Sequence, residues 1–153
     1  MVMKLHEYRV ALDRVLELVV LLNDDMVRSL AGSGLTVSRA HLLWELRQRG
    51  PTTQRVLADA LRVSPRTITG LVDGLVETGF VTREAHPTDR RATLVSFTEH
   101  GTKTVLALKR GHEELARALF ATMRDEDFAC FAAGLDVVLV RIREQLSTKG
   151  GNR

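Results

Sequence analysis

Apolar side chains recur every three or four positions along residues 5–31, which predicts one long helix. The stripe is formed by Leu5, Tyr8, Leu12, Val15, Val19, Leu22 and Met26. It is widened by Leu16, Leu18, Val20, Leu21, Val27 and Leu30. A helix that is apolar over most of its circumference must be covered on more than one side. In a chain this small, a second subunit is the natural cover.

A second helix follows the break at Gly32-Ser33-Gly34. Thr36 or Ser38 caps it, and it runs to about Arg49, where Gly50-Pro51 stops it. The residues predicted to point inward are Ala40, Leu43, Trp44 and Leu46.

Two short helices joined by a turn come next. The first spans residues 54–61. The second begins at Ser64-Pro65, an N-cap followed by proline in the first turn, and ends at Gly79. Its core face is predicted to hold Ile68, Leu71, Val72, Leu75 and Val76. Two helices with such a short connection form a helix-turn-helix.

Two β-prone runs, residues 80–85 and 92–98, flank a polar loop and predict a hairpin with an exposed, charged tip. The helix after the hairpin is expected to run to about Met123. Asp125 caps a final helix, and residues 147–153 are expected to fray. This helix carries a seam for packing against other helices, formed by Phe128, Phe131, Leu135, Val138, Ile142 and Leu146.

This order of elements predicts a mainly α fold with a small β-hairpin wing. We expect a single domain over residues 1–153. A winged helix-turn-helix lobe at residues 36–98 would be flanked by dimerisation helices at 1–35 and 99–148. The hydrophobic content of 44% is ordinary for a soluble globular protein, and an aromatic content of only 5% suits helices packed through Leu, Val and Ala.

Several classes of protein are disfavoured. The apolar run at residues 16–22 is far shorter than the roughly 20 residues of a membrane span, so we expect a cytoplasmic protein without membrane contact. A lone cysteine, Cys130, excludes an intrachain disulfide and a thiolate zinc cluster, and is typical of a small core residue. The five histidines lack metal-ligand spacing and no catalytic motif is present, so we expect no metal, no cofactor and no enzyme.

Arginines concentrate in the middle of the chain. Nine arginines, no lysine and six acids lie between Arg39 and Arg91, so this third carries the whole net charge of +3. The guanidinium of arginine can donate two parallel hydrogen bonds to a phosphate or to a guanine edge, which favours a nucleic-acid partner. The alternative interpretation is that these arginines belong to an ordinary charged surface that faces solvent.

The outer face of the second helix of the helix-turn-helix is unusual for a solvated surface. It carries Pro65, Arg66, Thr67, Thr69 and Gly70, where a solvated helix would carry Glu and Lys. Such a face suits the major groove of double-stranded DNA. Free N–H groups near Ser64 add an anion site, and Thr53 at the preceding helix start is a further candidate contact. An ordinary amphipathic helix is the alternative.

The hairpin tip supplies a second set of contacts. Arg90 and Arg91, with Arg83 on the preceding strand, are expected to reach phosphates or a narrow minor groove. Asp89 is expected to hold an arginine in position through a carboxylate–guanidinium fork, or else forms an incidental surface pair.

Several motifs follow one another through this region. They are Leu35-Thr36, LADAL at 57–61 with Val63-Ser64, TGLVDGL at 69–75, GFV at 79–81, DRR at 89–91 and FTEHG at 97–101. In these motifs the chain resembles the MarR family of bacterial transcriptional regulators. The resemblance implies a homodimer whose two winged lobes bind the halves of a near-palindromic operator. Many members carry arginine where this chain has Gly70 and Gly74, and Arg66 stands one turn before the first of these.

The resemblance also implies a small aromatic or phenolic effector between the dimerisation helices and the lobe. The candidate pocket residues are Met26, His41, Trp44 and Arg47. Plain core packing of Trp44 and a solvent-facing His41 are the simpler interpretations. The function predicted is a DNA-binding transcriptional regulator, foremost a repressor. A winged-helix module that binds proteins instead of DNA is the alternative.

Overall fold

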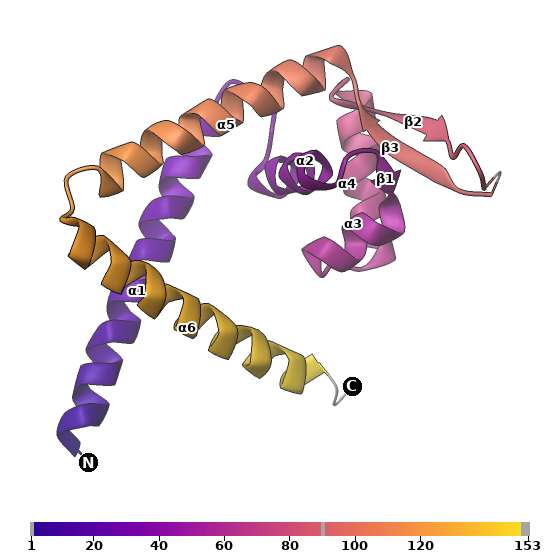
Figure 1. Cartoon of the computed structure of the whole chain (residues 1–153). Coiled ribbons are helices and arrows are strands. Elements are labelled where there is room, and N and C mark those ends of the chain that lie inside the picture. Colours follow the sequence, from indigo (N-terminus) through magenta and orange to yellow (C-terminus); the bar gives the residue numbers. More distant parts are fainter. Residues whose placement is uncertain (1, 90, 151–153) are drawn as a thin grey trace. The chain divides into compact units, whose positions relative to one another are not determined.

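The computed structural model describes residues 2–89 and 91–150 (Figure 1). The chain folds as two compact units, residues 1–109 and 110–153, and the boundary falls inside helix α5. The elements are α1 (Val2–Leu30), α2 (Val37–Arg49), β1 (Thr52–Thr53), α3 (Gln54–Leu61), α4 (Pro65–Glu77), β2 (Val81–Ala85), β3 (Thr93–Phe97), α5 (Glu99–Phe120) and α6 (Asp125–Gly150). The predicted lobe at residues 36–98 lies within the first unit, while the single-domain outline stays a prediction.

The predicted fold class is confirmed: the chain is mostly helical with one small antiparallel sheet. Strand β1 and the ends of α5 and α6 differ from the expectation. The two-residue strand β1 was not predicted, because so short a strand carries no alternating pattern. Helix α5 ends at Phe120 instead of Met123, in a turn where the N–H of Met123 donates to the Phe120 carbonyl at 3.0 Å. Helix α6 continues to Gly150, so the expected fraying from Ser147 is wrong over these residues.

Hydroxyl side chains fix where four of the helices begin. Thr36, Thr53, Ser64 and Thr98 each accept a hydrogen bond from the backbone N–H three residues later, at 3.3, 3.4, 3.1 and 3.0 Å. Such caps satisfy N–H groups that have no partner inside the helix. Thr36 is therefore the cap of α2, which decides between the two residues that the sequence offered.

The sheet connects the wing to the helix-turn-helix. Its strand order is β1-β3-β2, with all pairs antiparallel. Strand β3 lies in the centre and pairs Leu94 with Thr53 on one side and with Glu84 on the other. Because β1 runs directly into α3, the sheet ties the start of α3 to the β2–β3 hairpin, which extends away from the helices (Figure 1).

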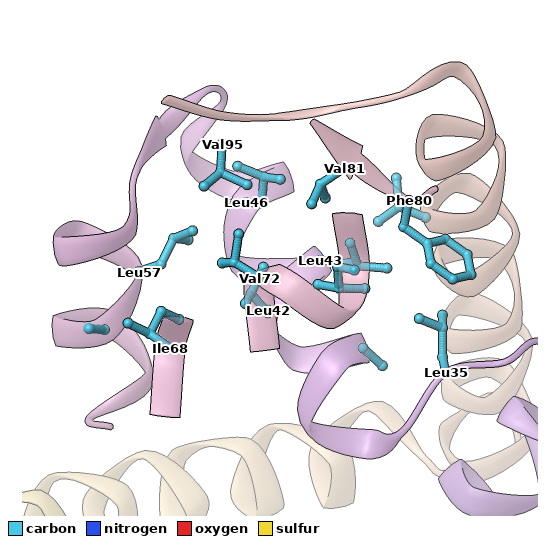
Figure 2. Packing of buried hydrophobic residues seen from close by; sticks show 14 of the residues in the cluster. Leu35, Leu42, Leu43, Leu46, Leu57, Ile68, Val72, Phe80, Val81 and Val95 are labelled. Carbon is cyan, nitrogen blue, oxygen red and sulfur yellow. The ribbon is translucent and has the colours of Figure 1, made fainter. Parts of the chain in front are cut away.

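The core of the first unit lies between α2, α3, α4 and the sheet (Figure 2). Its fully buried side chains are Leu42, Leu43, Leu46, Leu57, Ile68, Val72, Leu75, Val81 and Val95. The expectation for α2 is confirmed at Ala40, Leu43 and Leu46, but Trp44 is only half-buried and Leu42 is fully buried. The helix-turn-helix and the base of the wing thus pack around one shared hydrophobic core.

Helices α1 and α6 expose apolar faces instead. On α1 the exposed large side chains include Leu5, Tyr8, Leu12, Val15, Leu16, Val19 and Val20. On α6 they include Phe128, Phe131, Leu135, Val138, Ile142 and Leu146, the whole of the predicted seam. Cys130 is exposed as well, so its interpretation as a small core residue is wrong for this chain. Each face leaves an apolar surface far larger than isolated exposed residues explain.

Candidate nucleic-acid interface

The amino-terminal end of α4 presents the small polar surface that the sequence predicts. Pro65 occupies the first turn, and Ser64 caps the helix with its Oγ 2.8 Å from the Oγ1 of Thr67. The side chains on this surface are exposed at Pro65, Arg66, Thr67 and Thr69. Ile68, which lies between them in the chain, points into the core and is 2% exposed. The helix therefore buries one face and leaves a hydroxyl-rich face open.

Thr69 joins this surface to α3. Its Oγ1 donates to the carbonyl of Pro65 at 2.8 Å and lies 3.2 Å from Oε1 of Gln54. Gln54 is the first residue of α3 and follows Thr53, the cap of that helix. Its amide is thus brought to the open face of α4. Sequence reasoning missed Gln54, because only the packing of α3 on α4 shows that the two side chains meet.

The turn between α3 and α4 depends on a left-handed residue. Arg62 has φ 54°, and it is the one non-glycine with positive φ in the part of the chain that the structure describes. Its N–H donates to the Asp59 carbonyl at 3.3 Å, and the N–H of Val63 donates to the Ala58 carbonyl at 3.0 Å. These bonds end α3 and set the direction in which α4 begins.

The root of the wing is held to α4. The guanidinium of Arg83 in β2 forms an ion pair with the carboxylate of Asp73 in α4. This contact places Arg83 beside the helix and leaves its role toward phosphates a prediction. Asp73 was not anticipated from the sequence, since the pair joins residues on different elements. The wing and α4 are thereby linked by charge as well as through the core.

Side chains shape the backbone at the tip of the wing. His86 Nδ1 accepts hydrogen bonds from the N–H groups of Thr88 and Asp89 at 3.2 and 3.1 Å. Asp89 Oδ1 accepts from the N–H of Arg91 at 2.9 Å. Arg90 lies outside the described residues, so the predicted contact of Asp89 with an arginine side chain stays a prediction. The observed contacts join His86 to Thr88 and Asp89, and Asp89 to Arg91.

Two guanidinium groups are open to a partner at this surface. Arg66 on α4 and Arg91 in the wing are both exposed. Neither has a carboxylate partner within the described ranges 2–89 and 91–150. An unpaired arginine beside a helix amino terminus is a feature that binds anions.

The comparisons with known proteins agree on one family. A family model described as the MarR family matches residues 35–93. An HTH-type transcriptional regulator of Mycobacterium tuberculosis is 31% identical over 112 residues, which cover 73% of this chain and 78% of that protein. The chain belongs to the MarR family.

Further MarR-family similarity extends over most of the chain. The HTH-type transcriptional repressor YetL of Bacillus subtilis is 30% identical over 126 residues, or 79% of this chain and 74% of YetL. The crystal structure of Streptococcus pneumoniae FabT in complex with DNA superposes with a TM-score of 0.86, over 90% of this chain and 99% of FabT. At 18% identity, the similarity to FabT is one of fold.

One match is to an enzyme. A riboflavin kinase of Pyrococcus furiosus is 39% identical over 69 residues, which are 45% of this chain and 30% of the kinase. Because the match covers only this small part of the kinase, it assigns no kinase activity to this chain. The relatives matched over most of their length are described as HTH-type transcriptional regulators.

The predicted effector residues of this MarR-family chain lie in the first unit. His41, Trp44 and Arg47 are spaced by three along α2, and the Cζ of Arg47 lies 5.6 Å from the centre of the Trp44 ring. Met26 of α1 is half-buried and packs against the core. His41 is exposed. The three α2 residues thus share one helix face with a cation over an aromatic ring.

The described residues hold neither a cluster of metal ligands nor a membrane-spanning helix. They contain no group of three or more His, Cys, Asp or Glu placed to hold a metal ion. Within the same ranges, each helix is too short or too polar to cross a membrane.

Proposed function

We propose that this MarR-family protein binds a near-palindromic operator in double-stranded DNA as a homodimer and represses transcription. The observation that carries the proposal is the open face of α4, where Arg66 stands among exposed hydroxyl side chains at the capped helix start. Hydroxyls and an arginine at the beginning of a helix suit base edges and phosphates in a major groove. An ordinary solvated helix carries Glu and Lys at these positions.

The wing gives the proposal a second contact. Arg91 at its tip is exposed, and the core and the Asp73–Arg83 ion pair fix the hairpin beside α4. The recognition helices of a dimer would enter successive major grooves, about 34 Å apart. Each wing, with Arg90 and Arg91, would then lie on the phosphates or in the adjacent minor groove.

The dimer is supported by the apolar faces of α1 and α6. Each of these helices exposes large aliphatic or aromatic side chains along most of its length. Monomeric proteins rarely leave such surfaces in water. A second copy of the chain would cover both faces and set the spacing between the two recognition helices.

Repression and its release are the second part of the proposal. YetL, one of the relatives, is described as a repressor. A small aromatic or phenolic acid would stack on Trp44 and pair its carboxylate with Arg47, and His41 in α2 and Met26 in α1 are the further candidate contacts. Such an effector would act by favouring dimers whose recognition helices no longer match the groove spacing.

DNA selected from a random pool, followed by affinity measured across a range of salt, tests the proposed function. Arg91→Gln should lower the slope of log affinity against log salt by about 0.9, the effect of one lost phosphate contact. Arg124→Gln is the matched control, because Arg124 is exposed and lies in an ion pair with Asp127 in the second unit. If the slope of log affinity against log salt is unchanged in Arg91→Gln, the wing does not contact DNA phosphates as proposed. Failure of the wild-type protein to retain any DNA would favour the protein-binding alternative.

A further inference from the structure

The space beside Gly74 is occupied by an arginine from another helix, whose guanidinium would have to move to admit a side chain. A Cβ built on Gly74 would lie 2.0 Å from Nη2, 2.6 Å from Cζ and 3.0 Å from Nε of Arg39. These distances mean that the guanidinium of Arg39, in the first turn of α2, rests against the backbone of α4. Glycine is the residue that permits this approach.

The backbone of Arg39 is held where it is by its own helix. Thr36 caps α2 through the N–H of Arg39 at 3.3 Å, and the buried Leu42 and Leu43 fix α2 in the core. Arg39 as a whole is half-buried. Throughout the described residues no carboxylate pairs with it, and Asp73, the neighbour of Gly74, is paired with Arg83 instead. Arg39 is therefore a positioned cation without a partner.

The position of Arg39 along α4 indicates what it meets. Thr67, Gly70 and Gly74 are spaced by three and four, so they share one face of α4. Gly74 is nine residues beyond Pro65, which is about 13 Å along the helix axis. The major groove is about 12 Å wide. With the start of α4 in the groove, Gly74 lies level with the groove edge, where the phosphates run.

We propose that Arg39 contacts an operator phosphate, and that α2 thereby supplies the cation that α4 lacks at Gly74. The proposal rests on the proposed DNA binding. It adds a contact from outside the helix-turn-helix and the wing. It also relates the departure from the family at Gly74 to Arg39, since a side chain at that position would displace the guanidinium of Arg39.

Neutralising Arg39 tests the contact. Arg39→Gln should lower the slope of log affinity against log salt by about 0.9. It should weaken binding to operator DNA and to random DNA by the same factor, as expected for a phosphate contact. Arg39→Lys should keep most of the slope, because the charge is retained. Arg124→Gln is again the control. A purely structural Arg39 would instead change the melting temperature of Arg39→Gln and leave the slope at the wild-type value.

Moving the arginine between helices gives a second test that does not depend on one variant folding. Gly74→Ala keeps every charge but displaces the guanidinium, and should weaken operator binding by about tenfold. Arg39→Gln combined with Gly74→Arg should restore the slope. Wild-type slope and affinity in both single variants, while Arg91→Gln still lowers the slope, would overturn the role of Arg39 alone. Wild-type protein that binds no DNA would overturn this proposal and the proposed function together.

Discussion

At the scale of single residues, Gly101 is the position where the fold has least freedom. A Cβ there would lie 1.8 Å from the carbonyl oxygen of Phe80 and 3.1 Å from Cδ1 of Phe97. The first of these atoms is backbone and cannot move aside alone. We expect Gly101→Ala to lower the free energy of unfolding by about 3 kcal/mol, measured by urea denaturation.

Gly111 is the matched control for Gly101 in the same helix. A Cβ at Gly111 would meet nothing within 4 Å. Gly111→Ala should therefore raise the stability of α5, by about 0.8 kcal/mol, because alanine favours the helix. If both substitutions change the free energy of unfolding equally, helix propensity and not the contact with Phe80 determines the effect at Gly101.

Ser64 combines a structural and an electrostatic role that two substitutions can separate. Ser64→Ala removes the bond to the N–H of Thr67 and should cost about 1 kcal/mol of stability. Ser64→Asp keeps a capping oxygen, so its melting temperature should stay near that of the wild type. Its added negative charge should nevertheless weaken DNA binding strongly. A Ser64→Asp variant with full affinity would exclude a phosphate at this helix start.

At the scale of elements, the wing depends on its connection to α4. Asp73→Asn removes the ion pair with Arg83, and exposed pairs of this kind contribute less than about 1 kcal/mol. We expect little change in global stability but faster amide exchange in β2 and β3, measured by hydrogen–deuterium exchange. Asp127→Asn, which breaks the pair with Arg124 in the second unit, should leave that exchange unchanged.

The sequence predicts the elements well where a periodic pattern or a cap marks them. Helices α3 and α4 begin at the expected residues, because Thr53 and Ser64 are hydroxyl caps that act within three positions of themselves. Contacts between elements could not be predicted in the same way. The pairs Thr69–Gln54 and Arg83–Asp73 depend on how the helices and strands pack, and the sequence spacing of 15 and 10 residues carries no signal for them.

At the scale of the whole molecule, the apolar seam of α6 predicts an obligate assembly. Val138→Asp with Ile142→Asp would place two charges on a seam whose side chains are 48% and 50% exposed in the single chain. Because a buried charge without a partner is costly, we expect monomers or insoluble protein. Light scattering after size-exclusion chromatography measures the mass. Ser147→Asp, in the same helix but off the seam, is the control, and a soluble double-variant dimer would contradict the role of the seam.

The single tryptophan makes the proposed effector site measurable in the whole protein. Trp44 is the one tryptophan of the chain, and its ring faces Arg47. A phenolic acid that stacks on this ring should quench its fluorescence and release operator DNA at the same concentrations. Arg47→Gln should weaken both effects together. Quenching without release would indicate a site that is not coupled to DNA binding.

The contact between Arg39 and Gly74 also restricts the order in which the sequence can change. While Arg39 is present, a Cβ at position 74 would lie 2.0 Å from its guanidinium, so a substitution there requires this flexible group to move. Once position 39 carries a shorter residue, the same substitution no longer meets a guanidinium. The two positions are therefore coupled: the effects of substitutions at them should not add, and a side chain at 74 is accommodated most easily after a change at 39.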